Sequence, residues 1–363
     1  MTSPASNGAE GARRPVAVIA GGSAGIGLAS AIRFAEEGYD VAIFARHEER
    51  VMREAERLRQ RGVRAMGHAC DVGDAKAVEA AKDAVMAQFG RIDVWVNCAM
   101  LTVFGAFEDL EDDEFRKVMD TTFMGQVNGT RAALSVMRPA GRGAIVNVGS
   151  GLSYRPVPLQ SAYCSAKHAI NGFTSSVRSE LIHDGFDHIS LSLVQLPAVN
   201  TPQFSWARHK MERTPRPAPP AFQPEVAADA IFQAAREGSR ELLVGRSVAG
   251  LVFGQMAVPN YLDHKMADAG YSGQKSDTPA SGWRDGNLME PVDGDWGAHG
   301  DFDDEAADSG MIVDADTMRY AVFAGGALFL LGAGMALGAA MRPREEHTII
   351  AQTERQRRLA RHI

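Results

Sequence analysis

The sequence has little that would support a disulfide-stabilised, metal-binding or nucleic-acid-binding protein. Its 363 residues include three cysteines, Cys70, Cys98 and Cys164, which are too few and too scattered for a disulfide framework or a metal site. We therefore expect reduced thiols in a reducing compartment. Cys164 is expected to be a small buried side chain, with a reactive thiol as the alternative. The net charge of −7 argues against a general nucleic-acid binder.

The N-terminus has no long hydrophobic run. Residues 1–14 are mostly small and polar, and we expect them to be disordered. Arg13 and Arg14 precede an apolar stretch, as in a twin-arginine export signal, but Val16 to Ala20 is short and continues directly into glycines. A buried first strand is the better interpretation, and it places the following domain in the cytoplasm.

A glycine-rich turn follows this strand and precedes an amphipathic helix. Such a turn lets the backbone approach a pyrophosphate, and the helix N-terminus supplies free N–H groups. The spacing is Gly-x-x-x-Gly-x-Gly, which differs from the commoner Gly-x-Gly-x-x-Gly fingerprint. The candidate cofactor contacts in the turn are Gly21, Ser23, Gly25, Ile26 and Gly27.

The end of the second expected strand, residues 40–45, predicts which dinucleotide binds. A carboxylate at this point would bind the ribose 2′-hydroxyl of NAD, but here Ala45 is followed by Arg46. A guanidinium matches the 2′-phosphate of NADP. We therefore predict that the cofactor is NADP. The alternative is that Arg46 only caps or solvates the loop.

Strands continue to alternate with helices, at residues 63–69, 92–96 and 144–148, with helices at about 75–89 and 112–137. This order predicts an α/β fold, a doubly wound parallel sheet of the Rossmann type. Ligands bind beyond the carboxyl ends of such strands. The side chains expected there are those of Arg46, Asp71, Asn97 and Ser150.

Tyr163 and Lys167 are spaced to share one helix face, and Ser150 precedes the tyrosine by thirteen positions. An ammonium beside a phenol lowers the phenol pKa, which makes tyrosine usable as a general acid or base. The serine hydroxyl can donate to a substrate oxygen. Alone, the spacing is weak evidence, because many helices carry it by chance.

Taken together, these motifs resemble the short-chain dehydrogenase/reductase family over about residues 16–244. The resemblance implies a small-molecule carbonyl or alcohol substrate, a nicotinamide cofactor and, commonly, a homo-oligomer. It implies that Tyr163 transfers the proton, that Lys167 lowers the pKa of Tyr163 and holds the ribose, and that Ser150 positions the substrate oxygen. It adds cofactor contacts at Asp71, Val72, Asn97, Ala99 and Thr201.

Two departures from the family pattern bear on mechanism. Thr122 stands where the family has an asparagine that is thought to hold a water in a proton relay to the lysine. A threonine hydroxyl could still bind water, although slower proton exchange is one possible outcome. Pro197 replaces a glycine after the sixth strand, at about 189–194, which stiffens the loop and removes an N–H.

The reductase domain is expected to end at about residue 250, with a proline-rich lid over the substrate at 204–224. Residues 251–284 are expected to be helical or irregular. Residues 285–316 hold eleven acidic residues and no lysine or arginine, which predicts a solvated acidic linker, with a partner site as the alternative.

A hydrophobic helix is expected within residues 317–341. Residues 320–341 carry no charge over 22 positions, a length that reaches the roughly 30 Å of a bilayer core. We predict a membrane helix, with a buried helix at a soluble oligomer interface as the alternative. The basic tail 342–363 has a charge of +6 − 3 = +3, which prefers the cytoplasm, although one span cannot also keep the reductase domain there.

The sequence therefore predicts an NADP-dependent oxidoreductase that is membrane-associated with its catalytic domain in the cytoplasm. A non-catalytic protein that senses NADP or binds a partner is the main alternative, motivated by Thr122 and the long C-terminal extension. An epimerase or dehydratase shares the Tyr163 and Lys167 spacing, but the glycine spacing fits the simple reductases better.

Overall fold

The computed structural model describes residues 14–341, 353–358 and 360. The expected disordered segment 1–14 lies almost wholly outside the described residues, as does most of the basic tail 342–363. Two compact units are distinguished, residues 1–315 and residues 316–363.

The first unit is built on an eight-stranded sheet in the order β15-β12-β7-β6-β4-β1-β2-β3. All its neighbouring strands are parallel except β12 and β15, which are antiparallel. The chain order of the first strands reverses beside β1, which is the crevice where doubly wound sheets bind ligands. The strands are β1 Val16–Ala20, β2 Asp40–Ala45, β3 Ala65–Ala69, β4 Val94–Asn97, β6 Gly143–Val148, β7 Ile189–Gln195, β12 Glu241–Val244 and β15 Ile312–Asp314.

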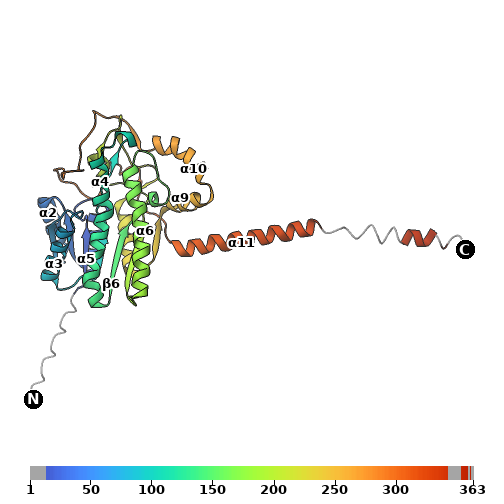
Figure 1. Cartoon of the computed structure of the whole chain (residues 1–363), viewed down its shortest axis with the longest axis horizontal. Helices are drawn as coiled ribbons and strands as arrows, with labels where there is room; N and C mark the ends of the chain where they lie inside the picture. Colours follow the sequence, from blue (N-terminus) through green and yellow to red (C-terminus); the bar gives the residue numbers. More distant parts are fainter. Residues whose placement is uncertain (1–13, 342–352, 359, 361–363) are drawn as a thin grey trace, which may run out of the picture. The chain divides into compact units, whose positions relative to one another are not determined.

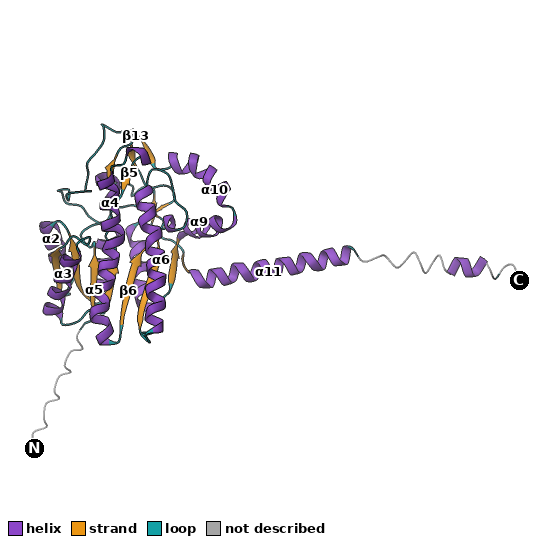
Figure 2. Cartoon of the chain, viewed as in Figure 1, coloured by secondary structure: helices purple, strands orange, loops and turns teal. Residues whose placement is uncertain are grey.

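Helices cover both faces of this sheet, as Figure 2 shows. One face packs against α1 (Gly25–Glu36), α2 (Glu48–Arg59) and α8 (Pro224–Glu237). The other packs against α3 (Ala75–Phe89), α5 (Gly125–Ala140) and α6 (Ser161–His183). The three-layer α/β architecture predicted from the alternation is confirmed.

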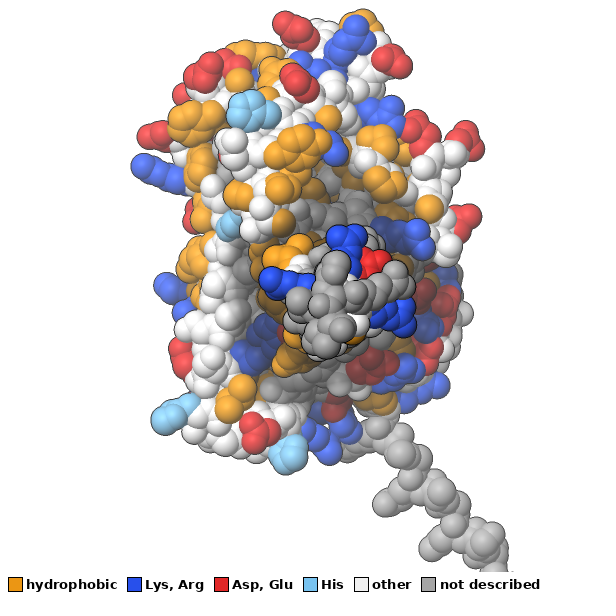
Figure 3. All heavy atoms as spheres, turned by 90° about the vertical axis from the view of Figure 1, so that its right-hand side faces the viewer, with side chains coloured by type: hydrophobic (Ala, Val, Ile, Leu, Met, Phe, Trp, Pro, Cys, Tyr) orange, Lys and Arg blue, Asp and Glu red, His pale blue; other side chains and the backbone are white. Residues whose placement is uncertain are grey.

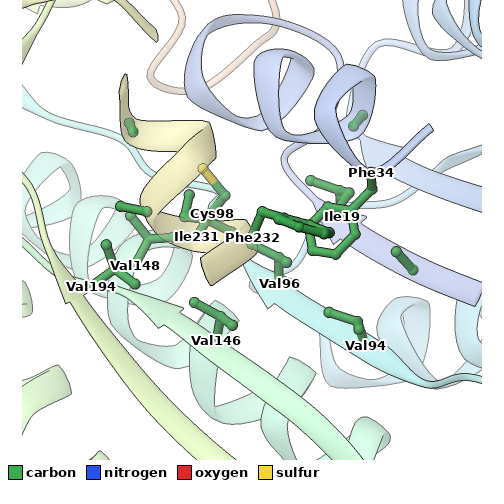
Figure 4. Close-up of a cluster of buried hydrophobic side chains, with 14 of the residues drawn as sticks. Ile19, Phe34, Val94, Val96, Cys98, Val146, Val148, Val194, Ile231 and Phe232 are labelled. Carbon is green, nitrogen blue, oxygen red and sulfur yellow. The ribbon is translucent and has the colours of Figure 1, made fainter. Parts of the chain in front are cut away.

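The core between α1, α8 and the sheet is formed by alternate residues of the central strands. Figure 4 shows Val94, Val96, Val146 and Val148 directed toward Phe232 and its neighbours. These strands are apolar on both faces because helices cover both, which is why they read as continuous hydrophobic runs in the sequence.

The helix expected over residues 112–137 is interrupted. It consists of α4 (Asp112–Met119), a π-helical turn (Asp120–Met124) and α5. Gly125 begins α5 directly against Val72, where an added Cβ would come within 2.6 Å of that side chain. Single π turns inside helices often lie at functional sites, and this one contains Thr121 and Thr122.

Smaller elements surround the carboxyl ends of the strands. They include two two-stranded sheets, β5 with β9 and β10 with β13, and a three-stranded sheet in the order β14-β11-β8. Their bounds, with those of the remaining helices, are β5 Val103–Phe104, β8 Ala198–Val199, β9 Arg208–His209, β10 Arg213–Pro215, β11 Ala221–Phe222, β13 Lys275–Pro279, β14 Ala306–Ala307, α7 Gln203–Trp206, α9 Gly245–Ala257 and α10 Pro259–Lys265; 3₁₀ turns span Phe107–Asp109 and Gly151–Ser153, and a second π turn spans Met266–Gly270.

The segment 285–316 differs from the solvated linker that its composition predicts. Within it, β14 pairs with β11 and β15 extends the main sheet by pairing with β12. Its acids contact basic side chains from distant parts of the domain, as in the pairs of Asp295 with Arg57 and Glu305 with Arg216. The segment folds onto the domain because those cations, and not residues nearby in sequence, neutralise it.

The second unit contains α11, Ala315–Ala340. Its stretch Ala315–Leu337 has a mean hydropathy of 1.8 and is not buried, and among the described residues it is the one helix long and apolar enough to cross a membrane. Large apolar side chains such as Phe323, Leu328 and Phe329 are more than half exposed. The helix predicted from the uncharged run is therefore present in the structure.

Candidate active site

Helix α6 brings Tyr163 and Lys167 to one face, beside the end of β6. The Lys167 side chain is only 2% exposed, and its ammonium donates to the Val148 carbonyl at 2.7 Å. The same nitrogen lies 5.5 Å from the centre of the Tyr163 ring. Ser150 follows β6 and accepts a hydrogen bond from the Leu152 N–H at 3.1 Å. Of the four residues predicted to be catalytic, Ser150, Tyr163 and Lys167 line a single cavity, and Thr122 does not.

Burial dominates the protonation of this pair. It lowers the pKa of Lys167 to about 8. It also raises the pKa of Tyr163, and a hydrogen bond with Ser150 offsets only part of that rise. The expectation that the lysine leaves Tyr163 with a lowered pKa is not met in this structure, because desolvation of the phenolate outweighs the favourable interactions around it.

The same cavity extends along the glycine turn. It has a volume of about 540 Å³ and is lined at this end by Gly21, Ser23, Gly25, Ile26 and Gly27. Gly21 and Gly25 have φ of +93° and +56°, a region that favours glycine. Helix α1 begins at Gly25, so the N-terminus of this helix lies at this end of the cavity, with its Gly25 N–H donating to the Gly297 carbonyl.

Other predicted cofactor residues line the cavity too: Arg46, Asp71, Val72, Ala99 and Thr201. Asp71 accepts hydrogen bonds from Lys117 at 2.7 Å and from the Gly73 N–H at 2.9 Å. Burial acts to raise the pKa of Asp71, but these bonds and the nearby Lys117 charge hold it below its usual value. The site thus keeps a carboxylate at this point of the cavity wall.

Arg46 is placed at the cavity wall but is already engaged. Its guanidinium donates to the backbone carbonyls of residues 287, 288 and 289, with Nη1 2.9 Å from the Met289 oxygen. Burial lowers its pKa, although the Asp71 charge opposes that shift. Of its five N–H donors, Nε–H and one on Nη2 remain for other partners.

Two predicted residues lie outside the cavity lining. Asn97 is 2% exposed, and its amide bonds Asn147 at 2.8 Å and the Trp95 indole N–H at 2.8 Å. Its amide nitrogen also donates to the Thr130 hydroxyl at 3.2 Å, so Asn97 ties the sheet to α5 instead of facing the cavity. Thr122 is fully buried, and its hydroxyl accepts from the Leu101 N–H at 2.9 Å and donates to the Leu101 carbonyl at 3.0 Å.

These bonds change the interpretation of Thr122. Its hydroxyl proton is committed to the Leu101 carbonyl, so the side chain acts on the backbone after β4 and not on a water beside Lys167. The neighbouring Thr121 lines the cavity and has a buried hydroxyl without a partner among the described residues. Sequence reasoning missed Thr121 because the π turn, which decides which threonine faces the cavity, leaves no local signature.

The substrate end of the cavity is lined by apolar side chains, including Leu152, Val157, Val248, Leu251 and Met266. The last three belong to residues 245–270, beyond the segment where family-like motifs occur. Nearby on α9 and α10, Met256 and Tyr261 are exposed by more than 60%. In the space-filling view of Figure 3, hydrophobic side chains gather in patches between charged ones.

The segment 204–224, expected to form a lid over the substrate, is partly packed into the domain. Phe204 lines the cavity, yet it is 7% exposed and packs against Phe104, Leu159 and Met211. Trp206 also lines the cavity, whereas Met211 does not. Pro219 and Pro220 complete this wall. Phe204 therefore belongs both to the cavity wall and to a hydrophobic cluster.

The chain matches the model of the short chain dehydrogenase family over residues 15–212, and it belongs to that family. It is 33% identical over 268 residues to an uncharacterized oxidoreductase, YxnA, of Bacillus subtilis, covering 73% of this chain and 75% of that protein. It is 38% identical over 183 residues to the short-chain reductase NovJ of Streptomyces niveus, covering 50% and 70%.

Two solved structures share the fold. An actinorhodin polyketide ketoreductase with NADPH is 34% identical, with a TM-score of 0.50, over 52% of this chain and 72% of that one. An alcohol dehydrogenase of the archaeon Thermococcus sibiricus, complexed with 5-hydroxy-NADP, is 27% identical, with a TM-score of 0.53, over 63% and 95%. The protein is accordingly an oxidoreductase of this family.

Proposed function

We propose that this protein interconverts a carbonyl and an alcohol with NADP as its cofactor. The observation that carries the proposal is that Ser150, Tyr163 and Lys167 line the same cavity as the glycine turn. A nicotinamide cofactor would supply or accept the hydride, and the protein contributes geometry and electrostatics. The buried, unpartnered Thr121 hydroxyl and the glycine-lined end of the cavity fit such a group.

Each catalytic side chain has a distinct role in this proposal. Tyr163 gives its proton to the substrate oxygen during reduction and takes it back during oxidation. Ser150 hydrogen-bonds the same oxygen. Lys167 keeps positive charge beside the tyrosine, which favours the phenolate as the proton leaves. Thr122 positions the backbone at Leu101 and does not itself touch the substrate.

The preference for NADP rests on the end of β2. Ala45 offers no carboxylate to a ribose 2′-hydroxyl, and Arg46 lies in the cavity wall with two N–H donors left for a phosphate oxygen. Direct titration of NADPH and NADH, followed by cofactor fluorescence, tests this point. Tighter binding of NADH would overturn the preference.

The substrate is proposed to have an apolar part beside its reacting group. The cavity near Tyr163 is walled by aliphatic side chains from α9 and the second π turn, among them Val248, Leu251 and Met266. Lys265 and Arg216 also line the cavity. A panel of apolar ketones and aldehydes, assayed by NADPH oxidation, would identify the class.

Replacement of Tyr163 separates catalysis from a sensor function. For Tyr163→Phe we expect turnover to fall at least about 100-fold, because a general acid of this kind contributes that much or more. Cofactor binding should be retained. The matched control is Tyr261→Phe on the exposed surface of α10, which should leave both properties unchanged. Unchanged turnover in Tyr163→Phe would favour the sensor alternative.

Membrane association is proposed through α11. The support is its length, hydropathy and exposed apolar side chains, together with the small residues Gly334 and Gly338, which allow close helix approach. Carbonate extraction of cell membranes is the test. Release of the whole chain into the supernatant would refute the proposal, and retention that is lost on deleting residues 317–341 would support it.

A further inference from the structure

Residues 285–300, which we call the strap, run along the outside of the cofactor end of the cavity. The first residues of the strap contact Arg46, whose guanidinium donates to three successive backbone carbonyls, at residues 287–289. Figure 1 shows this part of the chain, in orange, looping past the side of the sheet where α2 lies. None of it belongs to the matched family segment, which ends at residue 212.

Helix α2 fixes the middle of the strap by charge. Asp295 pairs with Arg53 at 3.0 Å and with Arg57 at 3.2 Å, and Asp293 lies 3.2 Å from His47. Arg50 donates to the Val292 carbonyl. The acids of the strap thus face the cations of α2, which explains why so acidic a segment lies against the domain.

An aromatic pair and one backbone bond fix the end of the strap. The Trp296 ring packs edge-on against Trp206, with centroids 5.2 Å apart. The Gly297 carbonyl accepts the N–H of Gly25 at 3.0 Å, at the first residue of α1. Both partners, Gly25 and Trp206, are residues of the cavity wall.

The strap also lines the cavity itself. Asn287, Pro291 and Val292 share the wall with Arg46 and Asp71. The side-chain oxygen of Asn287 is buried and has no hydrogen-bond partner among the described residues. A buried acceptor without a donor is uncommon in folded proteins and needs an explanation such as a missing partner.

We propose that the strap is part of the cofactor site, closing it over the adenosine half, and that cofactor exchange requires the strap to open. This inference rests on the proposed function, because it concerns the same cofactor. Backbone carbonyls of the strap bind the Gly25 N–H and one side of the Arg46 guanidinium, so the strap lies directly beside the groups that a cofactor phosphate would approach. The Asn287 amide supplies a neutral acceptor beside a strand end that lacks a carboxylate.

The contacts that hold the strap make the proposal measurable. Exposed ion pairs and an aromatic pair are individually weak, so the strap can open without unfolding the domain. Removing several of them should raise the fraction of time for which it is open. Entry and exit of cofactor would then both accelerate, because both pass through the open form.

The test compares the full chain with the double variant Asp295→Lys, Trp296→Ala in stopped-flow mixing with NADPH. Binding is followed by NADPH fluorescence, and release by displacement with excess NADP. We expect both rate constants to rise about tenfold. The matched control is Asp304→Lys, Trp283→Ala, which makes the same changes at exposed positions that contact neither α2 nor Trp206; its rates should equal those of the wild type.

The possible results separate this inference from the proposed function. Binding with unchanged rates in the double variant would overturn the strap and leave the proposed function intact. Faster release with unchanged entry would overturn the opening step. Failure of the wild type to bind either nicotinamide cofactor would overturn both proposals. As a second variant, Asn287→Leu should weaken NADPH binding about tenfold by removing one hydrogen-bond acceptor, and unchanged affinity would refute that contact.

Discussion

Replacing Lys167 by methionine tests the protonation of the active site through protein stability. Lys167 is buried, and burial lowers its pKa to about 8 from an ordinary value of 10.5. The unfolded chain therefore binds the proton more tightly than the native protein. Below pH 8 the charged lysine destabilises the fold, and this penalty shrinks as the pH rises from 8 to 10.5.

The size of the effect follows from the two pKa values. The full penalty is about 3 kcal/mol, from about 1.4 kcal/mol per pKa unit. Between pH 7 and pH 9 it should decrease by about 1.3 kcal/mol. The free energy of unfolding of the wild type should therefore rise by this amount relative to Lys167→Met. Tyr163 and the cysteines are present in both proteins, so their contributions largely cancel in the difference between the two free energies of unfolding.

Urea unfolding of the full chain at pH 7, 8 and 9, followed by tryptophan fluorescence, measures this difference. The control is Lys76→Met, which makes the same change at an exposed position of α3. A Lys167→Met difference that changed by less than about 0.3 kcal/mol over this range would refute the reasoning, because Lys167 would then titrate as it does in the unfolded chain.

Three further predictions concern two glycines, Thr122 and the cysteines. Gly129→Ala should destabilise the protein by about 3 kcal/mol or more, because the new Cβ would lie 2.0 Å from the Asn97 amide oxygen. Gly172→Ala should stabilise the protein by about 0.5–1 kcal/mol, because its Cβ would meet nothing within 4 Å. Urea unfolding measures both changes. Thr122→Val should cost about 1–3 kcal/mol by leaving the Leu101 backbone unpaired, with Thr122→Ser recovering most of it; equal losses would contradict this account. The three buried cysteines should react slowly with iodoacetamide at pH 7.5, because burial raises their pKa values to between about 11 and about 12; rapid labelling of the native protein would contradict their burial.

The parts of the site that the sequence predicted are those encoded by local patterns. The glycine turn follows directly on a buried strand, and Tyr163 and Lys167 lie one helical turn apart. A parallel sheet brings the carboxyl ends of its strands together, so Arg46, Asp71 and Ser150 could be assigned to one edge without knowledge of any contact. The cavity joins all of them.

The roles of Asn97 and Thr122 could not be predicted because they depend on contacts across the sheet and between helices. Asn97 lies at a strand end, where a polar side chain can face either the cavity or the helix layer beneath. Its close approach to Gly129, Trp95 and Asn147 decides the matter. For Thr122, the π turn rotates the helix so that its hydroxyl meets Leu101.

The acidic segment shows where composition misleads. Residues 285–316 hold eleven acids and no lysine or arginine, which describes a solvated linker only if cations elsewhere in the chain are ignored. Those cations lie on α2, more than 230 positions earlier, where arginines at 50, 53 and 57 recur on a helical spacing. Such a stripe is usually a solvated face, and only the fold brings Asp295 to it.

Arg46 connects this segment to the choice of cofactor. If Arg46 bound only a 2′-phosphate, its guanidinium would need no backbone partner. If it bound only the carbonyls of the strap, a neutral donor at this position would bind them with a smaller desolvation penalty. The Arg46 guanidinium carries a charge in a buried position beside Asp71, and its Nη1 and Nη2 groups donate to three backbone carbonyls. The other side remains available for an anion. In the proposed site, Arg46 would therefore both hold the strap and bind a phosphate of the cofactor, which would couple closure to the presence of that phosphate.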